Sequence, residues 1–324
     1  MKDITTISKI GLGLLPTPFY KLHNISKLTG KQVFIKRDDM TGVALGGNKV
    51  RKLEYVLADA AANGCDTIIT TGAAQSNHAM LTAACCRRLG LDVLLVLKKS
   101  GVTEKKGNLL LNDLMGVEVR FVDSADYDGV YMEMDKIRSI LINSGRKPYV
   151  IPVGASVPLG SLGYVDCVRE MTEQAKRQDI KIDNIVFADG SGGTHAGVLL
   201  GAKLFSEGTK VTGIVVSPEK DFQGQVLKIA HGACELLESD IALTREDVIM
   251  ADYIGPGYSV PSEPGNAAIR LMAENEGIFL DPTYTGKAFA GMLDLNSKGY
   301  FKDDETIVFL HTGGAASLFA IQTD

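Results

Sequence analysis

The feature that most constrains the fold of this chain is a regular alternation of short apolar runs with helical patterns. Eight runs rich in β-branched residues are predicted to be strands, at 33–36, 67–71, 93–97, 117–122, 149–153, 184–188, 212–217 and 306–310. Helical periodicity between them predicts helices at 49–63, 77–89, 129–143, 160–178, 194–205, 264–276 and 285–298. This alternation indicates an α/β fold in which helices cover both faces of parallel sheets.

The size and charge of the chain narrow its class. With 324 residues and 45% hydrophobic content it can bury a substantial core, and the usual domain size favours about two domains. The net charge of −5 comes from interspersed charges of both signs, which argues against nucleic acid as a partner. No apolar run approaches the roughly 18 residues that cross a bilayer, and the N-terminus lacks a signal pattern. We therefore expect a soluble cytoplasmic protein with no membrane partner.

The cysteines do not predict a metal or disulfide framework. They have neither the spacing of a metal finger nor the density of a disulfide scaffold. We therefore expect no metal site and five reduced structural thiols. These are Cys65, Cys85, Cys86, Cys167 and Cys234.

A lysine follows a glycine turn at the predicted start of the helix at 49–63. Gly46 and Gly47 permit a tight turn, and Asn48 is a good N-cap that places Lys49 in the first helical turn. The helix dipole there disfavours an ammonium, which makes the amine a better nucleophile toward an aldehyde. The alternative is an ordinary solvent-facing lysine.

A second segment, at 184–197, runs from a buried strand through three glycines into a helix. Glycines let backbone N–H groups converge on an anion, and serine and threonine hydroxyls add donors. The spacing matches neither the Walker motif nor the dinucleotide fingerprint. A plain strand-to-helix turn is the alternative. A reactive amine together with a phosphate seat is what pyridoxal phosphate requires, whereas a non-catalytic nucleotide-binding protein would use the seat alone.

Two further sets of polar residues follow predicted strands. Gln75, Ser76 and Asn77 lie at a helix start after the strand at 67–71, where they are suited to hold a carboxylate, although capping explains Ser76 and Asn77 equally well. Near the C-terminus, Thr312 follows the strand at 306–310, at the end where ligands bind in open α/β sheets. Tyr258 and Tyr284 stand in glycine- and proline-rich segments, for which ordinary loop chemistry is the alternative.

Taken together and in order, these motifs resemble a known family. They are Lys-Arg-Asp-Asp at 36–39, Leu-Gly-Gly-Asn-Lys-Val-Arg-Lys-Leu-Glu at 45–54, Gln-Ser-Asn-His at 75–78, Ser-Gly-Gly-Thr-His-Ala-Gly at 191–197, Asp-Pro-Thr-Tyr-Thr-Gly-Lys at 281–287 and His-Thr-Gly-Gly at 311–314. The chain is similar over its whole length to the D-cysteine desulfhydrase and 1-aminocyclopropane-1-carboxylate deaminase family of pyridoxal-phosphate enzymes.

The resemblance implies a tryptophan-synthase-β-like fold (fold type II), with two parallel-sheet domains and pyridoxal phosphate between them. Residues 1–50 and 160–324 would form the large cofactor domain, and 51–159 a small inserted α/β domain. The resemblance also implies a homodimer.

The same resemblance implies roles for individual residues. Lys49 would join the cofactor covalently and then abstract a proton, with Tyr258, Tyr284 and Ser76 as further catalytic residues. The substrate would meet Gln75, Ser76, Asn77, Tyr258, Tyr284 and Thr285. The cofactor would be held by Lys49, Lys52, Asn77, Ser191, Gly192, Gly193, Thr194 and Thr312.

Two positions favour one activity within the family. The deaminases carry a glutamate and an aliphatic residue where this chain has Thr285 and Thr312, and the desulfhydrases carry threonine at both. The resemblance therefore implies β-elimination of D-cysteine to pyruvate, hydrogen sulfide and ammonia. The alternatives are the same chemistry on L-cysteate, D-serine or β-chloroalanine, or deamination of 1-aminocyclopropane-1-carboxylate.

Overall fold

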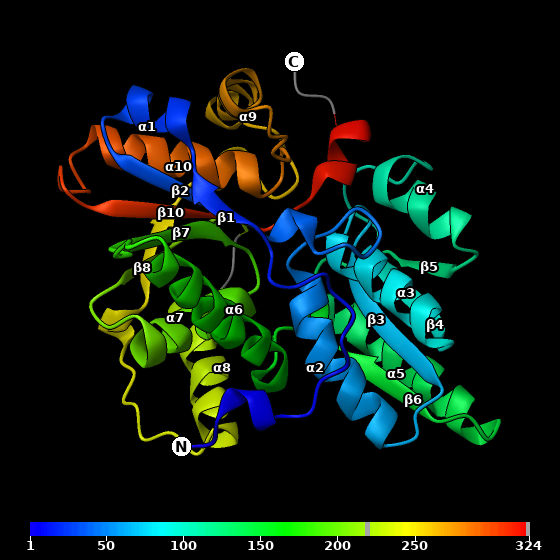
Figure 1. Cartoon of the computed structure of the whole chain (residues 1–324). Coiled ribbons are helices and arrows are strands. Elements are labelled where there is room, and N and C mark those ends of the chain that lie inside the picture. Colours follow the sequence, from blue (N-terminus) through cyan, green and yellow to red (C-terminus); the bar gives the residue numbers. More distant parts are fainter. Residues whose placement is uncertain (218–220, 322–324) are drawn as a thin grey trace.

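The computed structural model describes residues 1–217 and 221–321, and it contains two sheets (Figure 1). The larger sheet has the strand order β1-β2-β10-β7-β8-β9 and the smaller the order β5-β4-β3-β6. Every strand pair is parallel except the antiparallel pair β1–β2. The strands are β1 (Phe19–Lys21), β2 (Gln32–Arg37), β3 (Thr67–Ala73), β4 (Asp92–Lys98), β5 (Glu118–Val122), β6 (Pro148–Ile151), β7 (Asn184–Asp189), β8 (Lys210–Val215), β9 (Ile249–Asp252) and β10 (Thr306–His311).

Ten α-helices surround the two sheets in the described residues. They are α1 (His23–Thr29), α2 (Lys49–Ala62), α3 (Asn77–Leu89), α4 (Gly107–Leu114), α5 (Tyr127–Asn143), α6 (Pro158–Arg177), α7 (Gly193–Phe205), α8 (Phe222–Leu236), α9 (Glu263–Glu276) and α10 (Thr285–Ser297). All eight predicted strands and all seven predicted helices are confirmed, with ends that shift by a few residues.

The segments that the sequence did not predict are mostly short. Strands β1 and β9 have three and four residues, and helices α1 and α4 have seven and eight. Segments of this length span too few residues for a period to stand out. Helix α8 has 15 residues and was missed although its apolar side chains pack against α7.

Each sheet has a buried core on both of its faces. Helices α9 and α10 cover one face of the larger sheet, and α6 and α7 cover the other. In the smaller sheet, α2 and α3 pack on one face and α5 on the other. All seven residues of β3 are buried, as expected for a central parallel strand.

Helix α2 lies between the two sheets in Figure 1 and packs on α6 of the larger unit. At this contact the backbones of the two helices approach closely, since a Cβ at Gly163 would lie 2.3 Å from the carbonyl oxygen of Arg51. The smaller sheet uses strands between residues 67 and 151, inside the range 51–159 expected for the small domain. The exact domain boundaries stay a prediction, and the large-domain range includes positions 218–220 and 322–324, outside the described residues.

Two further properties concern membranes and thiols. Among the described residues, no helix combines the length and the apolar character that a membrane span requires. The five cysteines are free thiols, and burial raises the pKa of Cys85 to about 12. A buried thiol with a raised pKa is a poor nucleophile, which agrees with the structural role expected for these residues.

Candidate active site

A cavity of about 660 Å³ opens where the carboxyl ends of both sheets meet. Its wall includes the ends of β3, β4 and β7, the residues that follow β10, and the first residues of α2, α3, α5 and α7. Parallel strands place ligands at this edge, and helix N-termini there carry free N–H groups. The predicted residues that line it are Lys49, Ser76, Asn77, Ser191, Gly192, Thr194, Tyr258, Tyr284 and Thr312.

Lys49 is the first residue of α2 and follows a turn that only glycine can form. Gly46 and Gly47 have φ values of 73° and 140°, and a Cβ at Gly46 would lie 1.8 Å from the carbonyl oxygen of Asp39. Burial lowers the pKa of Lys49 to about 8, against the opposing charge of Asp189. The amine is therefore neutral far more often near neutral pH than an exposed lysine, as a nucleophile requires.

Asn48 precedes α2 as predicted, but its side chain does not cap the helix. The residue already has helical backbone angles, and its Nδ2 donates to Thr194 Oγ1 at 3.1 Å. Its backbone N–H donates to the carbonyl oxygen of Thr312 at 2.9 Å. The prediction of a cap was wrong for the side chain, because a capping residue has extended backbone angles and Asn48 already has helical ones. These bonds join three of the predicted motifs.

The glycine-rich segment forms an anion seat at the start of α7. Gly192 has a φ of 75°, and a Cβ at Gly193 would lie 2.7 Å from both Lys52 Nζ and Ser156 Oγ. Lys52 Nζ donates to the carbonyl oxygen of Gly154 at 3.1 Å, and Ser156 Oγ lies 2.8 Å from Ser191 Oγ. A lysine amine, two hydroxyls and a helix N-terminus thus lie close together, and this set of groups suits a phosphate.

Lys52 is wholly buried beneath this seat and does not itself line the cavity. Burial lowers its pKa well below the ordinary lysine value, and the nearby charge of Lys49 lowers it further. An anion bound in the seat acts in the opposite direction and favours the ammonium.

Ser76 and Asn77 occupy the start of α3 and line the cavity. Ser76 Oγ accepts a capping hydrogen bond from the backbone N–H of Ala79 at 3.2 Å. Asn77 Oδ1 accepts from Asn108 Nδ2 at 2.7 Å, which fixes the Asn77 amide with its nitrogen as the remaining donor. Ser76 therefore caps α3 and also lines the cavity, so the two interpretations of this segment do not exclude each other.

Tyr258 and Tyr284 face each other across one side of the cavity. Their hydroxyls are hydrogen-bonded, and their rings meet edge to face with centroids 5.9 Å apart. Burial raises the pKa of both phenols, so both stay protonated at neutral pH. Since one proton serves the bond between them, the pair retains a second proton that it can donate to a bound group.

The structure does not bring Gln75 and Thr285 to the cavity. Gln75 Nε2 donates to the carbonyl oxygens of Val102 and Lys106, both at 3.1 Å, so the amide anchors the segment before α4. Thr285 is fully buried, and its hydroxyl donates to Asp281 Oδ1 at 2.8 Å. Both side chains form hydrogen bonds with protein groups away from the cavity, because a buried polar group without a partner is costly.

Several cavity residues were missed from the sequence. Asp189 ends β7, and its Oδ2 lies 2.6 Å from His195 Nδ1 in a wholly buried pair. The adjacent glycine-rich segment could have drawn attention to Asp189, since it stands at a strand's carboxyl end. The small unit contributes a wall after β4 and at the start of α5, for which the sequence offers no recognisable signal. The residues of this wall are Lys98, Ser100, Ala125, Asp126, Tyr127 and Asp128.

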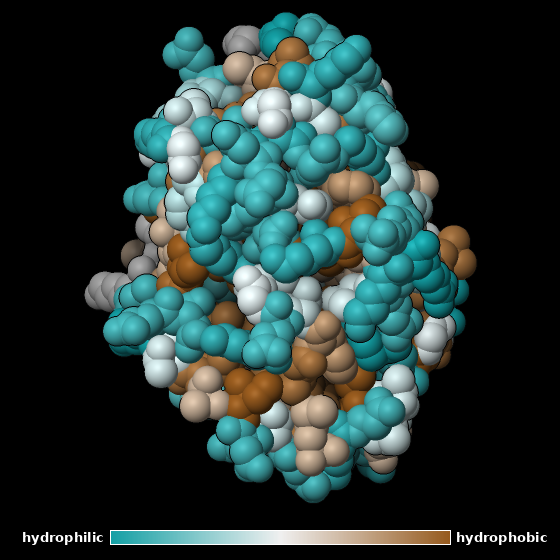
Figure 2. Space-filling model, turned by 60° about the vertical axis from the view of Figure 1, so that its left-hand side comes forward, coloured by the Kyte–Doolittle hydropathy of each residue, from teal (hydrophilic) through white to brown (hydrophobic). Residues whose placement is uncertain are grey.

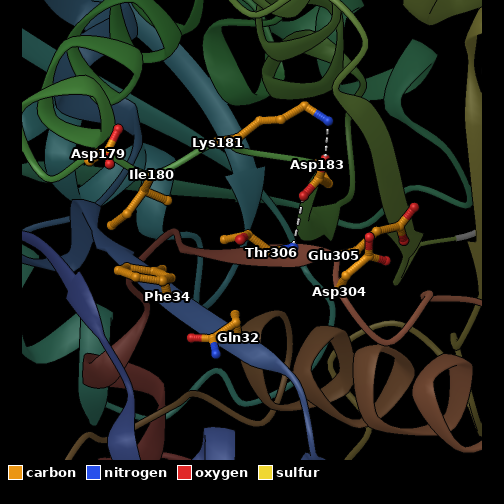
Figure 3. A pocket seen from close by; sticks show the side chains of 9 residues that line it. All are labelled: Gln32, Phe34, Asp179, Ile180, Lys181, Asp183, Asp304, Glu305 and Thr306. Carbon is orange, nitrogen blue, oxygen red and sulfur yellow. Dashed lines mark hydrogen bonds and ion pairs between the residues drawn. The ribbon is translucent and has the colours of Figure 1, made fainter.

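A second cavity, of about 340 Å³, lies at the amino ends of the strands of the larger sheet (Figure 3). It is lined by the first residues of β2 and β10 and by four acidic side chains. Asp183 accepts from Lys181 Nζ at 2.6 Å and from the backbone N–H of Thr306 at 2.9 Å, so its carboxylate is already satisfied. In the part of the chain that the structure describes, no cluster of side chains could hold a metal ion.

The residues around the larger cavity fit pyridoxal phosphate. Lys49 supplies the amine, and the start of α7 at Gly193 lies beside the Lys52 amine and the Ser156 hydroxyl, groups that suit a phosphate. Within the described residues, two buried acceptors beside this space, His78 Nδ1 and Asp189 Oδ1, lack a donor. When bound, the cofactor provides an aldehyde for the lysine and a conjugated ring that takes up carbanion charge.

Comparison with known proteins agrees with this class. The family model described as pyridoxal-phosphate dependent enzyme matches residues 10–313. A D-cysteine desulfhydrase from Klebsiella pneumoniae subsp. pneumoniae is 40% identical over 326 residues, covering 99% of this chain and 98% of the relative. The crystal structure of an ACC deaminase homologue superposes with a TM-score of 0.91 at 41% identity, covering 98% of this chain and 94% of that chain.

The chain therefore belongs to the pyridoxal-phosphate-dependent enzymes and, within them, to the D-cysteine desulfhydrase and ACC deaminase family. Its fold is that of fold type II, as expected from the sequence. A more distant structure, the diaminopropionate ammonia lyase of Escherichia coli, shares this fold with a TM-score of 0.68 at 16% identity, covering 97% of this chain and 87% of that chain. Membership of an enzyme family leaves the non-catalytic nucleotide-binding alternative without support.

Proposed function

We propose that this enzyme eliminates the β-substituent of D-cysteine and releases pyruvate, hydrogen sulfide and ammonia. The observation that carries the proposal is the hydroxyl-rich lining of the cavity, which combines Tyr258, Tyr284 and Ser76 with Thr312. Thr312 and Thr285 stand where the deaminases of the family carry an aliphatic residue and a glutamate. The chain is similar to D-cysteine desulfhydrases and, to the same degree, to a putative 1-aminocyclopropane-1-carboxylate deaminase, so the two threonines make the choice between the activities.

Lys49 has the properties of the base in this reaction. Its lowered pKa, about 8, makes the free amine a proton acceptor near neutral pH. The tyrosine pair at Tyr258 and Tyr284 holds a proton that can be donated to the departing sulfur, and Ser76 and Asn77 present donors to the substrate carboxylate at the start of α3. Asn77 and Thr312 would contact the cofactor ring, and the seat from Ser191 to Thr194 would hold the phosphate above Lys52.

A panel of amino acids tests the substrate. Pyruvate should form fastest from D-cysteine and more slowly from L-cysteine, L-cysteate, D-serine and β-chloroalanine, and sulfide should accompany it only from the two cysteines. Opening of 1-aminocyclopropane-1-carboxylate would instead yield 2-oxobutanoate and should be absent or weak. A purified, cofactor-loaded enzyme that turns over one of the other compounds but leaves D-cysteine unchanged would refute the proposed substrate and retain the class of reaction.

We also propose that the enzyme is a cytoplasmic homodimer. Figure 2 shows a largely hydrophilic face with hydrophobic side chains gathered toward its lower end, and such side chains are candidates for burial between subunits. Light scattering of the cofactor-loaded protein measures its mass directly. A mass that stays at 34.7 kDa, that of one chain, over the accessible concentrations would exclude the dimer.

A further inference from the structure

Asn108 is a fully buried residue to which the reaction proposed above assigns no role. It is the second residue of α4, and it does not itself line the cavity. Its side chain nevertheless reaches a residue that does, because Asn108 Nδ2 donates to Asn77 Oδ1 at 2.7 Å. Asn77 is the first residue of α3 and lies 31 residues earlier in the chain. The contact therefore joins the starts of two helices of the small unit.

A backbone carbonyl fixes the orientation of the Asn108 amide. The same Nδ2 donates to the carbonyl oxygen of Gln75 at 2.8 Å. A carbonyl oxygen only accepts, so the nitrogen of the Asn108 amide, and not its oxygen, lies on this side. Its NH₂ group has two protons, and the second goes to Asn77 Oδ1. The Asn77 amide therefore has its oxygen toward Asn108, and its nitrogen remains to donate into the cavity.

The backbone around Asn108 is held just as firmly. Its N–H, which has no partner within the helix at this position, donates to Gln75 Oε1 at 2.9 Å. Gln75 Nε2 donates to the carbonyl oxygens of Val102 and Lys106, so the orientation of this second amide is fixed too. Gly107 has a φ of 51°, and a Cβ there would lie 2.7 Å from Gln75 Oε1. Only glycine before Asn108 allows α4 to start this close to Gln75.

Packing does not explain why position 108 is an asparagine. Among the described residues, Asn108 Oδ1 is buried without a hydrogen-bond partner, which is costly. The two ends of the Asn77 amide are nearly equal in size, so packing also does not select which of them faces the cavity. The hydrogen bond from Asn108 makes that selection.

We propose that Asn108 is a positioning residue that makes Asn77 a hydrogen-bond donor toward the cofactor ring. This inference rests on the cofactor contact of Asn77 in the proposed function, and not on the choice of substrate. The ring of pyridoxal phosphate carries an oxygen that is negatively charged when ionised, and an amide N–H stabilises that charge. An amide oxygen in the same place would repel it. Asn108 thus acts on the cofactor through Asn77 without touching it.

Asn108→Asp reverses the hydrogen bond without a change of size. A carboxylate oxygen then faces Asn77, whose amide should turn, donate to the carboxylate and present its oxygen to the cofactor. The test adds pyridoxal phosphate to the full-length chain after its cofactor has been removed. The dissociation constant should rise about tenfold to a hundredfold. The absorption maximum of the lysine-bound cofactor should shift as well.

Asn112→Asp is the matched control, because Asn112 lies one turn further along α4 and is also buried. Neither polar atom of its side chain has a hydrogen-bond partner within the described residues. The control therefore makes the same change from a buried amide to an acid without a contact to Asn77. Its melting temperature should fall, since an unpaired charge is buried. Its dissociation constant for pyridoxal phosphate and its absorption maximum should equal those of the wild type.

If Asn108→Asp fails to fold, a double-mutant cycle of Asn108→Ala and Asn77→Ala decides instead. Asn108→Ala should weaken cofactor binding when Asn77 is present. It should have no further effect in the Asn77→Ala background, because Asn108 acts only through that side chain.

Three results would overturn the proposal. They are wild-type affinity and spectrum in Asn108→Asp, an equal change in Asn112→Asp, and an effect of Asn108→Ala that persists without the Asn77 amide. No amino-acid substrate enters these measurements, so their failure is distinct from failure on D-cysteine.

Discussion

Asp38→Asn is expected to destabilise the fold strongly, because Asp38 is the centre of a buried ionic cluster beneath the first turn of α2. The carboxylate is fully buried and accepts from Arg51 Nε at 2.8 Å and from Arg51 Nη2 at 2.9 Å. Thr17 Oγ1 and the hydroxyl of Tyr164 donate to it at 2.8 Å and 2.6 Å. Asp38 therefore joins the segment before β1, the end of β2, α2 and α6.

The size of the expected destabilisation follows from the charge and the hydrogen bonds that an asparagine amide cannot provide. An asparagine retains one acceptor oxygen and places an NH₂ group toward donors. Of the two ion pairs that Arg51 forms with the described residues, the one with Glu170 at 2.8 Å would remain. Removing one partner of a buried ion pair costs about 3–5 kcal/mol. This is a large part of the roughly 5–15 kcal/mol that stabilises a typical folded protein.

The assay is urea unfolding of the full-length chain at neutral pH, followed by circular dichroism. Asp303→Asn is the matched control, because Asp303 pairs with Lys31 at 2.7 Å but is fully exposed, and surface pairs contribute little. The Asp38 variant should unfold at a clearly lower urea concentration and the control at that of the wild type. Equal midpoints for the two variants would refute the assigned importance of the cluster.

The same cluster predicts an acid effect with a definite sign. Burial alone would raise the pKa of Asp38, but the charge and hydrogen bonds of Arg51, together with the charge of Lys36, hold that pKa below its ordinary value. A depressed folded-state pKa contributes stability above the unfolded value, about 3.9, and loses it as the pH falls toward the folded value. The free energy of unfolding of Asp38→Asn should therefore depend less on pH below about 4 than that of the wild type.

Three further substitutions test the cavity. Lys49→Ala should abolish β-elimination and the visible absorbance of the bound cofactor while circular dichroism stays unchanged; residual turnover above a hundredth of the wild type would contradict its role as the base. Tyr258→Phe leaves Tyr284 without its hydroxyl partner and should lower kcat for D-cysteine by about 10²-fold, and an unaltered kcat would limit the pair to packing. Thr285→Glu should lower the melting temperature, because the larger charged side chain replaces a buried hydroxyl bonded to Asp281; a stable variant that opens 1-aminocyclopropane-1-carboxylate would instead show that position 285 reaches the cavity.

The sequence predicted the fold and the place of the site because both depend on local patterns. Apolar runs in parallel strands and glycines before helices are readable without tertiary contacts. Thus the strand at 184–188 and the following glycines predicted β7 and the start of α7, and the structure contains both; the anion seat stays a prediction. Lys49 was located by the same reasoning, since a glycine turn followed by a helix is a local feature.

Side-chain partners were not predictable in the same way. Thr285 lies next to a cavity tyrosine in sequence, yet its hydroxyl accepts from the backbone N–H of Asp281 and donates to the Asp281 carboxylate, both at 2.8 Å. Gln75 lies next to a cavity serine, yet its amide holds a loop some 30 residues away. Adjacent residues on a loop point in different directions, so sequence neighbours of a site residue need not belong to the site.

The effect of Asp189 on the charge balance of the cavity could not be inferred without the structure. A carboxylate at the end of β7, directly before the glycine-rich segment, would by itself repel a phosphate in the neighbouring seat. In the folded chain its charge instead opposes the effect of burial on both Lys49 and Lys52, and His195 Nδ1 holds it in a fixed orientation at 2.6 Å. The carboxylate thus favours the ammonium form of Lys52 beneath the seat, which attracts the anion. Two lysines three residues apart on one buried helix face repel each other, and the acid between the sheet and the helix offsets that repulsion.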